Sequence, residues 1–365
     1  MRLVLFVLLN SYCLSCFSQS HVIKIQGKII DRESLHPVPY ASIVIRDSNF
    51  GTASDSSGNF VIAFESIRHP NATIRISSIG FTSQSFSVDS ILRRTNEGIV
   101  TFRVRPEVIS LELVEISEKG INGKEIIKKA IAEIANNAYA KPFTLEYYSK
   151  IKISDSLKTF YTVENVFQDF NEGGYHTDFY LQQRSEGTSP LAKSKCGLPA
   201  HFDILQMDIL TSPYRNGILD AKNLPQFDVK YQGVIRYEGD SVYVIEYKAP
   251  KPTKQITATS TVPRNYFYSG KLYIDVASHA IVRHSLQQGI SKQPLSQEIL
   301  YRKVDGYYLP YYIESSRLVE ADKKKLVKLT NMLMLRDAQL NTKRPAPSFD
   351  NCNPPKFDSK FWSSF

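Results

Sequence analysis

The sequence predicts a mainly β protein in which a small β-sandwich precedes a helix and a curved antiparallel sheet. Three observations lead to this fold class. Short apolar runs between Gly27 and Phe81 are separated by turn residues, as in a sandwich. From Phe143 onward, longer runs alternate apolar and polar residues, as in strands with one solvated face. The 365 residues include 21 tyrosines and 20 phenylalanines, and aromatic side chains favour strands.

The first 18 residues have the pattern of an export signal. Arg2 supplies a positive start, the run from Leu3 to Leu9 is apolar, and Ser18 is a small residue at a plausible cleavage site. This apolar run is too short to span a bilayer, and no later run is long enough. A second interpretation is lipidation of Cys16, which follows a small residue. Both interpretations predict an exported protein.

The net charge of +9 does not by itself indicate a nucleic-acid partner, and we expect none, because the basic residues are scattered along the chain. Lys323 to Lys325 form the one basic run, which we interpret as a solvated hairpin end, with a lipid-headgroup patch as the alternative. Cys196 and Cys352 are candidates for one disulfide in an oxidising compartment. Neither has a second cysteine or a histidine at ligand spacing, so we expect no metal site.

The first domain is predicted at residues 22–108. Its apolar runs read as strands over residues 25–31, 38–45, 59–62 and 74–77. Between two of them, Asp55 can accept backbone N–H bonds and Gly58 can adopt a positive φ, so we predict a turn and not a calcium site.

Several motifs in this region carry a resemblance to a known family. They are Gly27–Asp31, Pro37–Ile43, Gly51-Thr52 with Asp55-x-x-Gly58-x-Phe60, and Ser78–Phe81. Together they resemble the carboxypeptidase regulatory-like, or peptidase-associated, domain. The resemblance implies a transthyretin-like sandwich of seven strands with an accessory role and no peptidase activity. His36 and Tyr40 depart from the family pattern, because each stands where the family usually has glycine.

A linker strand and a helix are predicted at residues 109–141. Leu111 to Ile116 resemble the strand that leads out of the sandwich family. Asn122 can cap the helix that follows, with Glu125 completing a capping box. The isoleucines and alanines from 126 to 134 recur at helical spacing, which favours a helix packed on the following sheet; a membrane-surface helix is the alternative.

The second domain is predicted at residues 142–340, with a tail at 341–365. Hairpins turn at Gly239 and at Asp305-Gly306, and about nine or ten strands follow from the alternation. Pro310 predicts that its strand is at an edge or broken. Gly270–Asp275 with Ala280–Arg283 resemble the central hairpin of LolA- and LolB-type lipoprotein carriers, which implies a half-barrel with an acyl-chain groove.

The alternation predicts one apolar face on this sheet. The candidate ligand-binding residues on it are Tyr231, Ile235, Tyr237, Tyr243, Ile245, Tyr247, Leu272, Ile274, Tyr311 and Ile313. A core filled by these same side chains, with no cavity, is the alternative, because any covered sheet alternates in this way.

The sequence contains no H-E-x-x-H, G-x-S-x-G or phosphate-loop motif, so we expect no catalytic residues and no cofactor. His176 with Asp178, and His201 with Asp203, are each two residues apart and would share a strand face. We interpret them as surface polar pairs. The carboxylates Glu164, Asp169 and Glu172 lie near Tyr161 in sequence, but nothing marks a cleft there.

From these features we expect a non-enzymatic exported protein with an accessory or binding role, holding an acyl chain or a peptide on the apolar face. The expected partners are envelope or outer-membrane proteins, together with a lipid or lipoprotein. The expected location is the periplasm or the outer-membrane periphery of a Gram-negative bacterium. Two alternatives stay open: a structural adaptor of an outer-membrane complex, and a hydrolase at His176 and Asp178.

Overall fold

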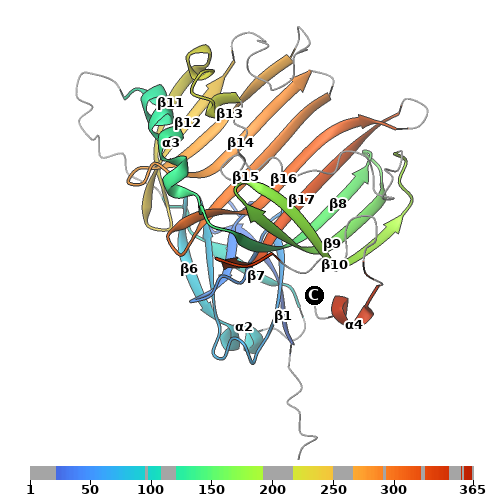
Figure 1. The fold of residues 1–365 in the computed structure, drawn as a ribbon. Helices are drawn as coiled ribbons and strands as arrows, with labels where there is room; N and C mark the ends of the chain where they lie inside the picture. The colour runs from blue at the N-terminus through green and yellow to red at the C-terminus, as the bar shows by residue number, and fades with distance from the viewer. Residues whose placement is uncertain are drawn as a thin grey trace, which may run out of the picture.

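The computed structural model describes residues 22–94, 98–107, 121–191, 217–249, 266–290, 293–321, 325–344, 355 and 357–363. Within these ranges it contains three β-sheets: two form a small sandwich, and the third is one large antiparallel sheet (Figure 1). The mainly β fold class is confirmed. No helix among the described residues is long and apolar enough to cross a membrane.

Seven strands form the sandwich, as the family resemblance implied. They are β1 (Val22–Asp31), β2 (Ser42–Ile45), β3 (Gly51–Ala53), β4 (Asn59–Glu65), β5 (Thr73–Ser78), β6 (Phe81–Ser87) and β7 (Val100–Val104), with α2 (Val88–Arg94) before β7. One sheet has the order β4-β1-β7 and the other β3-β2-β5-β6. Alternate residues of these strands, such as Ile29, Ile43, Ile62 and Ile74, fill the core between the two sheets.

The turn before β4 has the predicted chemistry. The Asp55 carboxylate accepts the backbone N–H groups of Ser57 and Asn59 at 2.8 and 2.9 Å, and Gly58 has φ +78°. These bonds satisfy amide groups at the point where the chain reverses into β4. The Asp55 turn therefore sets where β4 begins.

Ten strands form the large sheet. They are β8 (Phe143–Ser154), β9 (Thr159–Glu172), β10 (Tyr175–Gly187), β11 (Asp228–Tyr237), β12 (Asp240–Lys248), β13 (Tyr266–Asp275), β14 (Ile281–Ile290), β15 (Gln293–Val304), β16 (Tyr307–Glu320) and β17 (Leu326–Leu340). Their spatial order is β10-β9-β8-β17-β16-β15-β14-β13-β12-β11. Because β17 returns to pair with β8, the first and last strands of this part of the chain are neighbours in the sheet.

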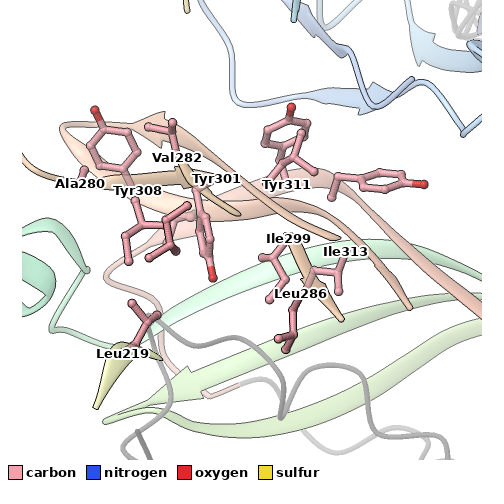
Figure 2. Close-up of a cluster of buried hydrophobic side chains, with 14 of the residues drawn as sticks. Leu219, Ala280, Val282, Leu286, Ile299, Tyr301, Tyr308, Tyr311 and Ile313 are labelled. Carbon is pink, nitrogen blue, oxygen red and sulfur yellow. The ribbon is translucent and has the colours of Figure 1, made fainter. Parts of the chain in front are cut away.

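One face of this sheet carries α3 (Gly123–Asn137), and we call it the helix face. Asn122 caps α3 as predicted, accepting the Lys124 N–H at 3.0 Å. Ile126, Ile127, Ala130 and Ile134 are buried in the core that α3 shares with the sheet. Figure 2 shows side chains of neighbouring strands in this core, with Leu286, Ile299 and Ile313 directed to the same side of the sheet. The short segments η2 (Gly217–Leu219) and η3 (Leu224–Gln226) add further apolar side chains to it.

The sandwich packs against the opposite face of the sheet, which we call the sandwich face (Figure 1). The Arg302 guanidinium donates to the Asn49 carbonyl, and the Asn49 amide donates to the Ala338 carbonyl at 3.2 Å. The Gly80 N–H donates to the Arg236 carbonyl at 3.0 Å. Contacts of this kind from the β2–β3 turn and the β5–β6 turn fix the sandwich to the sheet.

Tyr40 is held in an uncommon backbone conformation at this contact. Its φ of +61° lies in the region that glycine occupies most easily, which agrees with the glycine expected there from the family pattern. The Tyr311 hydroxyl donates to the Tyr40 carbonyl at 3.1 Å, and the Tyr40 and Tyr312 rings have centroids 4.9 Å apart. The contacts with the sheet therefore stabilise a turn that is unfavourable for tyrosine on its own.

A β-bulge in β11 corrects the prediction of a single apolar face. Tyr231 pairs with Ile245, but after the irregularity at residue 232 Ile235 pairs with Val242. Directly paired residues of antiparallel strands lie on the same face, and residues 242 and 245 lie on opposite faces of β12. The bulge thus moves Ile235 and Tyr237 to the sandwich face.

Pro310 is compatible with an internal strand for a local reason. It pairs with Tyr301 beside a register shift, in the part of β16 that precedes the pairing with β17. At this position β16 has a ladder partner on one side, so the missing N–H of proline leaves no gap in a second ladder. The sequence predicted that the strand of Pro310 is at an edge or broken. Around Pro310 this strand pairs on one side only, although β16 as a whole is an internal strand of the sheet.

We predict that His284 makes the stability of the sheet depend on pH. Burial lowers the pKa of His284 to about 3, from an ordinary value near 6.5. Protonation therefore favours the unfolded chain, and the stabilisation is complete above pH 6.5 and decreases as the pH falls from 6.5 towards 3. Between pH 6.5 and pH 5 the loss should be about 2 kcal/mol.

Urea unfolding of the wild type and of His284→Leu at these two pH values measures this effect. The difference in unfolding free energy between the two proteins should change by about 2 kcal/mol in favour of the variant at the lower pH. Equal pH dependence of the two proteins would contradict a neutral, buried His284.

Candidate functional site

A groove of 540 Å³ lies between the sandwich and the sandwich face of the sheet. One wall consists of β3, the Asp55 turn and β4. The other wall consists of side chains from β8, β9, β16 and β17, with Arg184 of β10 and Trp362 of α4 (Ser359–Ser363). The groove exists because the sandwich contacts the sheet through β3 and leaves the neighbouring β4 apart from it.

Cationic side chains outnumber carboxylates in the groove. The six cationic residues are Lys24, Lys150, Lys152, Arg184, Lys328 and Arg336, and the three acidic residues are Asp55, Glu164 and Glu314. Among the described residues, Lys24, Lys152 and Lys328 form no ion pair, whereas Lys150, Arg184 and Arg336 do. The groove therefore has an excess of positive charge that its own carboxylates do not neutralise.

Glu164 holds two of these cationic side chains in place. Its carboxylate accepts from Lys150 at 3.0 Å, from Arg184 at 2.6 Å, and from the Tyr148 hydroxyl. Burial raises the pKa of Glu164, but these three hydrogen bonds outweigh it and hold the pKa at about 2. Glu164 is thus ionised at neutral pH, and it fixes the two cations in place along the groove wall.

Apolar surfaces lie beside these charges. Met332 and Met334 of β17 line the groove, with Phe50 from the sandwich opposite them. The Arg336 guanidinium lies 5.5 Å from the centre of the Phe50 ring, and that of Arg184 lies 4.2 Å from the Trp362 ring. Stacking on aromatic rings keeps both guanidinium groups within the groove region.

A second cavity of 720 Å³ lies further along the sandwich face, and Glu314 lines both cavities. Its polar core is the Arg283–Glu298 ion pair at 3.0 Å, with the Ser285 hydroxyl also donating to Glu298. Burial raises the pKa of Glu314, which accepts from the Tyr312 hydroxyl at 2.6 Å. Three cationic and three acidic side chains line this cavity, so it has no net charge, and the groove is the stronger candidate for binding a charged ligand.

The predicted ligand-binding residues are divided between the two faces. The cross-strand register places Tyr231, Tyr243, Ile245, Tyr247, Leu272, Ile274 and Ile313 on the helix face, and packing places Ile235, Tyr237 and Tyr311 on the sandwich side. Seven of the ten are buried, and Tyr231, Ile235 and Tyr243 pack on the same core while partly exposed. These side chains already contact one another and the segments that cover the sheet.

The candidate pair His176 and Asp178 shares a face, as its spacing predicted, because both residues pair with one face of β9. The partner of His176 is nevertheless Asp169, whose carboxylate is 2.8 Å from Nδ1, while Nε2 lies 3.2 Å from the Asn171 amide. Both ring nitrogens therefore have partners on the adjacent strand. Side chains alternate between the two faces along β9, and Glu164 is an odd number of residues from Asp169. Glu164 therefore lies on the other face of the sheet.

Several predicted residues lie outside the described ranges: Cys16, Cys196, His201, Asp203, Cys352, the run Lys323-Lys324 and the strand 111–116. Among the residues that are described, no three His, Cys, Asp or Glu side chains are grouped so that they could hold a metal ion.

Sequence reasoning did not identify the groove as a site. Lys150 and Lys152 are visible in the sequence as the polar positions of an alternating strand, which is also the pattern of an ordinary solvated face. Only the packing of the sandwich over this face turns its lysines into the wall of a groove. The signal available in the sequence was the repeat of lysine at positions 150, 152 and 328 on one strand pair.

Comparison with known proteins agrees with the resemblance noted for the N-terminal region. Residues 25–116 match the model of the CarboxypepD_reg-like domain. A search of curated proteins gives no match.

Two solved structures similar to this chain are a LolA superfamily protein of Nitrosomonas europaea and a DUF1329 family protein of Desulfovibrio piger. The first has a TM-score of 0.27 and 10% identity, over 62% of this chain and 96% of its own. The second has a TM-score of 0.26 and 10% identity, over 60% and 92%. The first is a member of the superfamily that the hairpin at residues 270–283 resembles.

We predict that Glu164 stabilises the groove wall at neutral pH. Its pKa is lower in the folded protein than its ordinary value of 4.5, so its stabilisation is complete above pH 4.5 and is lost as the pH falls towards 2. Glu164→Gln should lower the unfolding free energy by about 1 to 2 kcal/mol at pH 7, allowing for solvent screening, and by less at pH 3.5.

The control is Glu246→Gln, at an exposed carboxylate that accepts from Gln232. It should change the unfolding free energy by no more than about 0.5 kcal/mol at either pH. If urea unfolding shows that the two substitutions lower the unfolding free energy equally, the hydrogen bonds of Glu164 do not stabilise the groove wall.

Proposed function

We propose that this chain is a non-catalytic, exported binding protein of the cell envelope, and that it binds an anionic, partly apolar ligand in the groove between its two domains. These domains are taken as residues 22–108 and 142–340. The observation that carries the proposal is the excess of cationic side chains in an interdomain groove that also has apolar walls. The match of residues 25–116 to a regulatory-like domain fits an accessory or binding role.

The chemistry of the groove favours a ligand that carries several negative charges along an extended body. Within the described residues Lys24, Lys152 and Lys328 form no ion pair, although the charge of Lys328 acts on Glu314 and opposes the rise in the pKa of that carboxyl. All three lysines are exposed residues, and like charges gathered along one groove attract an anion more strongly than an isolated charge does. Binding should therefore weaken as the salt concentration rises.

The groove suits this role better than the apolar face predicted from the sequence. Residues such as Ile245 and Leu272 on the helix face are fully buried beneath α3 and neighbouring side chains. An acyl chain could reach them after displacement of those covering elements, at the cost of the area that they now bury. The groove requires no such displacement, because its volume is present in the folded chain.

The arrangement around His176 supports a structural role more than a hydrolytic one. A general base needs a ring nitrogen directed at the substrate, and both nitrogens of His176 face side chains of β9. We therefore keep binding as the proposed function, with the groove as its site.

Native mass spectrometry of the protein from envelope extract tests this proposal. We predict that the wild type retains an anionic ligand, and that the double variant Lys152→Gln with Lys328→Gln loses it, because both ammonium groups are removed without breaking an ion pair among the described residues. The control is Lys230→Gln on an exposed position of β11, which should retain the ligand. If the wild type and the double variant both retain the ligand, or both lack it, the proposal that the groove is the binding site is contradicted.

A further inference from the structure

The outer strand of one sandwich sheet has an unpaired edge. β4 pairs with β1 on one side and is the end strand in the order β4-β1-β7. The Ile29 N–H donates to the Gly58 carbonyl, so these two residues form a hydrogen-bonded pair of the ladder. In an antiparallel ladder such pairs recur at every second residue. Phe60 and Ile62 are therefore the residues of β4 whose backbone groups bond to β1. Val61 and Ala63 consequently direct their N–H and C=O groups away from β1.

These outward groups have no hydrogen-bond partner within the described part of the chain. At the start of the strand the outward groups of Asn59 are satisfied, because its N–H donates to the Asp55 carboxylate and its carbonyl accepts the Asp55 N–H. No such bond reaches Val61 or Ala63. An edge of this kind is a template for pairing with another strand, and proteins usually block such edges.

The unpaired edge lies inside the groove. All residues from Asn59 to Ala63 line it, and the wall across from them carries Lys150, Lys152 and Lys328. A strand rises about 3.3 Å per residue, so this stretch can pair with a partner segment of about five residues. One wall therefore offers backbone hydrogen-bonding groups and the other offers ammonium groups. A ligand that fits between them needs a peptide-like backbone and negative charge.

We propose that the groove binds an extended acidic segment of a partner protein, which adds to β4 as a further strand and directs carboxylates at Lys152 and Lys328. This inference rests on the proposed binding function and specifies the ligand class. Main-chain hydrogen bonds to Val61 and Ala63 supply affinity for any extended backbone, and the lysines select for negative charge. Met332 and Met334 offer apolar surface to the side chains between the carboxylates.

Two further segments line the groove. Trp362 of α4 is buried, Arg184 stacks on it, and the Asp358 N–H of the same segment donates to Gln182 of β10. The Asp55 turn lines the groove at the start of β4.

The experiment measures fluorescence anisotropy of a fluorescein-labelled pentapeptide that alternates glutamate and valine, added to the full chain. Two further peptides carry N-methyl groups on alternate backbone amides, one in each register. Because successive amides of a strand point in opposite directions, only one register faces β4. We expect one methylated peptide to bind about tenfold more weakly than the parent and the other to bind nearly as well.

Protein variants separate the backbone from the charge. Val61→Pro removes an outward N–H at an edge position, where proline is tolerated, and should weaken binding of the parent peptide about tenfold. Lys152→Gln with Lys328→Gln should weaken it to a similar extent and reduce its salt dependence, whereas Lys230→Gln should not. If Val61→Pro fails to fold, the methylated peptides still provide the backbone test, because they leave the protein unchanged.

Three results would overturn the inference. These are equal binding of both methylated peptides and the parent, equal binding of a labelled peptide that alternates lysine and valine, and no binding of the acidic peptide. If the peptide fails while native mass spectrometry finds another anionic ligand that the lysine substitutions remove, the ligand class is wrong and the proposed binding function stands. If neither experiment finds a ligand, both proposals fail.

Discussion

The docking of the sandwich onto one face of the ten-stranded sheet is the contact on which the other features depend. A sheet of this size has two faces to cover, and α3 with η2 and η3 covers parts of one of them. The sandwich covers part of the other through hydrogen bonds such as Arg302 to the Asn49 carbonyl and Gly80 to the Arg236 carbonyl. Arg302 is 5% exposed, so docking takes its guanidinium out of water, and the hydrogen bond to the Asn49 carbonyl offsets part of that cost.

The same contact explains both the strained turn and the groove. Tyr40 keeps a positive φ because the Tyr311 hydroxyl and the Tyr312 ring hold it against the sheet. Since β3 contacts β17 directly, as in the Thr52 hydroxyl to Met334 sulfur contact of 3.4 Å, β4 is left beside the lysines of β8 and β17 without pairing to them. A backbone edge and a cationic wall thus face each other because of how the domains dock.

The sequence predicts local structure well in this chain, because local chemistry determines it. The Asp55 turn, the Asn122 cap and the alternating strands all follow from residues that are neighbours in the chain. The face of Ile235 could not be predicted, because a bulge at residue 232 leaves the alternation of residue types unchanged while reversing the side to which they point. The groove and the pairing of His176 with Asp169 depend on contacts between distant segments, which periodicity does not contain.

Hydrogen exchange of the Gly80 amide tests the docked arrangement most directly. This amide lies in a sandwich turn, and its partner is the carbonyl of Arg236 on the sheet, 3.0 Å away. Docking in solution predicts strong protection of Gly80 in the full chain, close to that of core amides of β5. Exchange of Gly80 at the rate of an unprotected turn, with β5 still protected, would show that the two domains fold but do not dock, and would contradict the account of the groove.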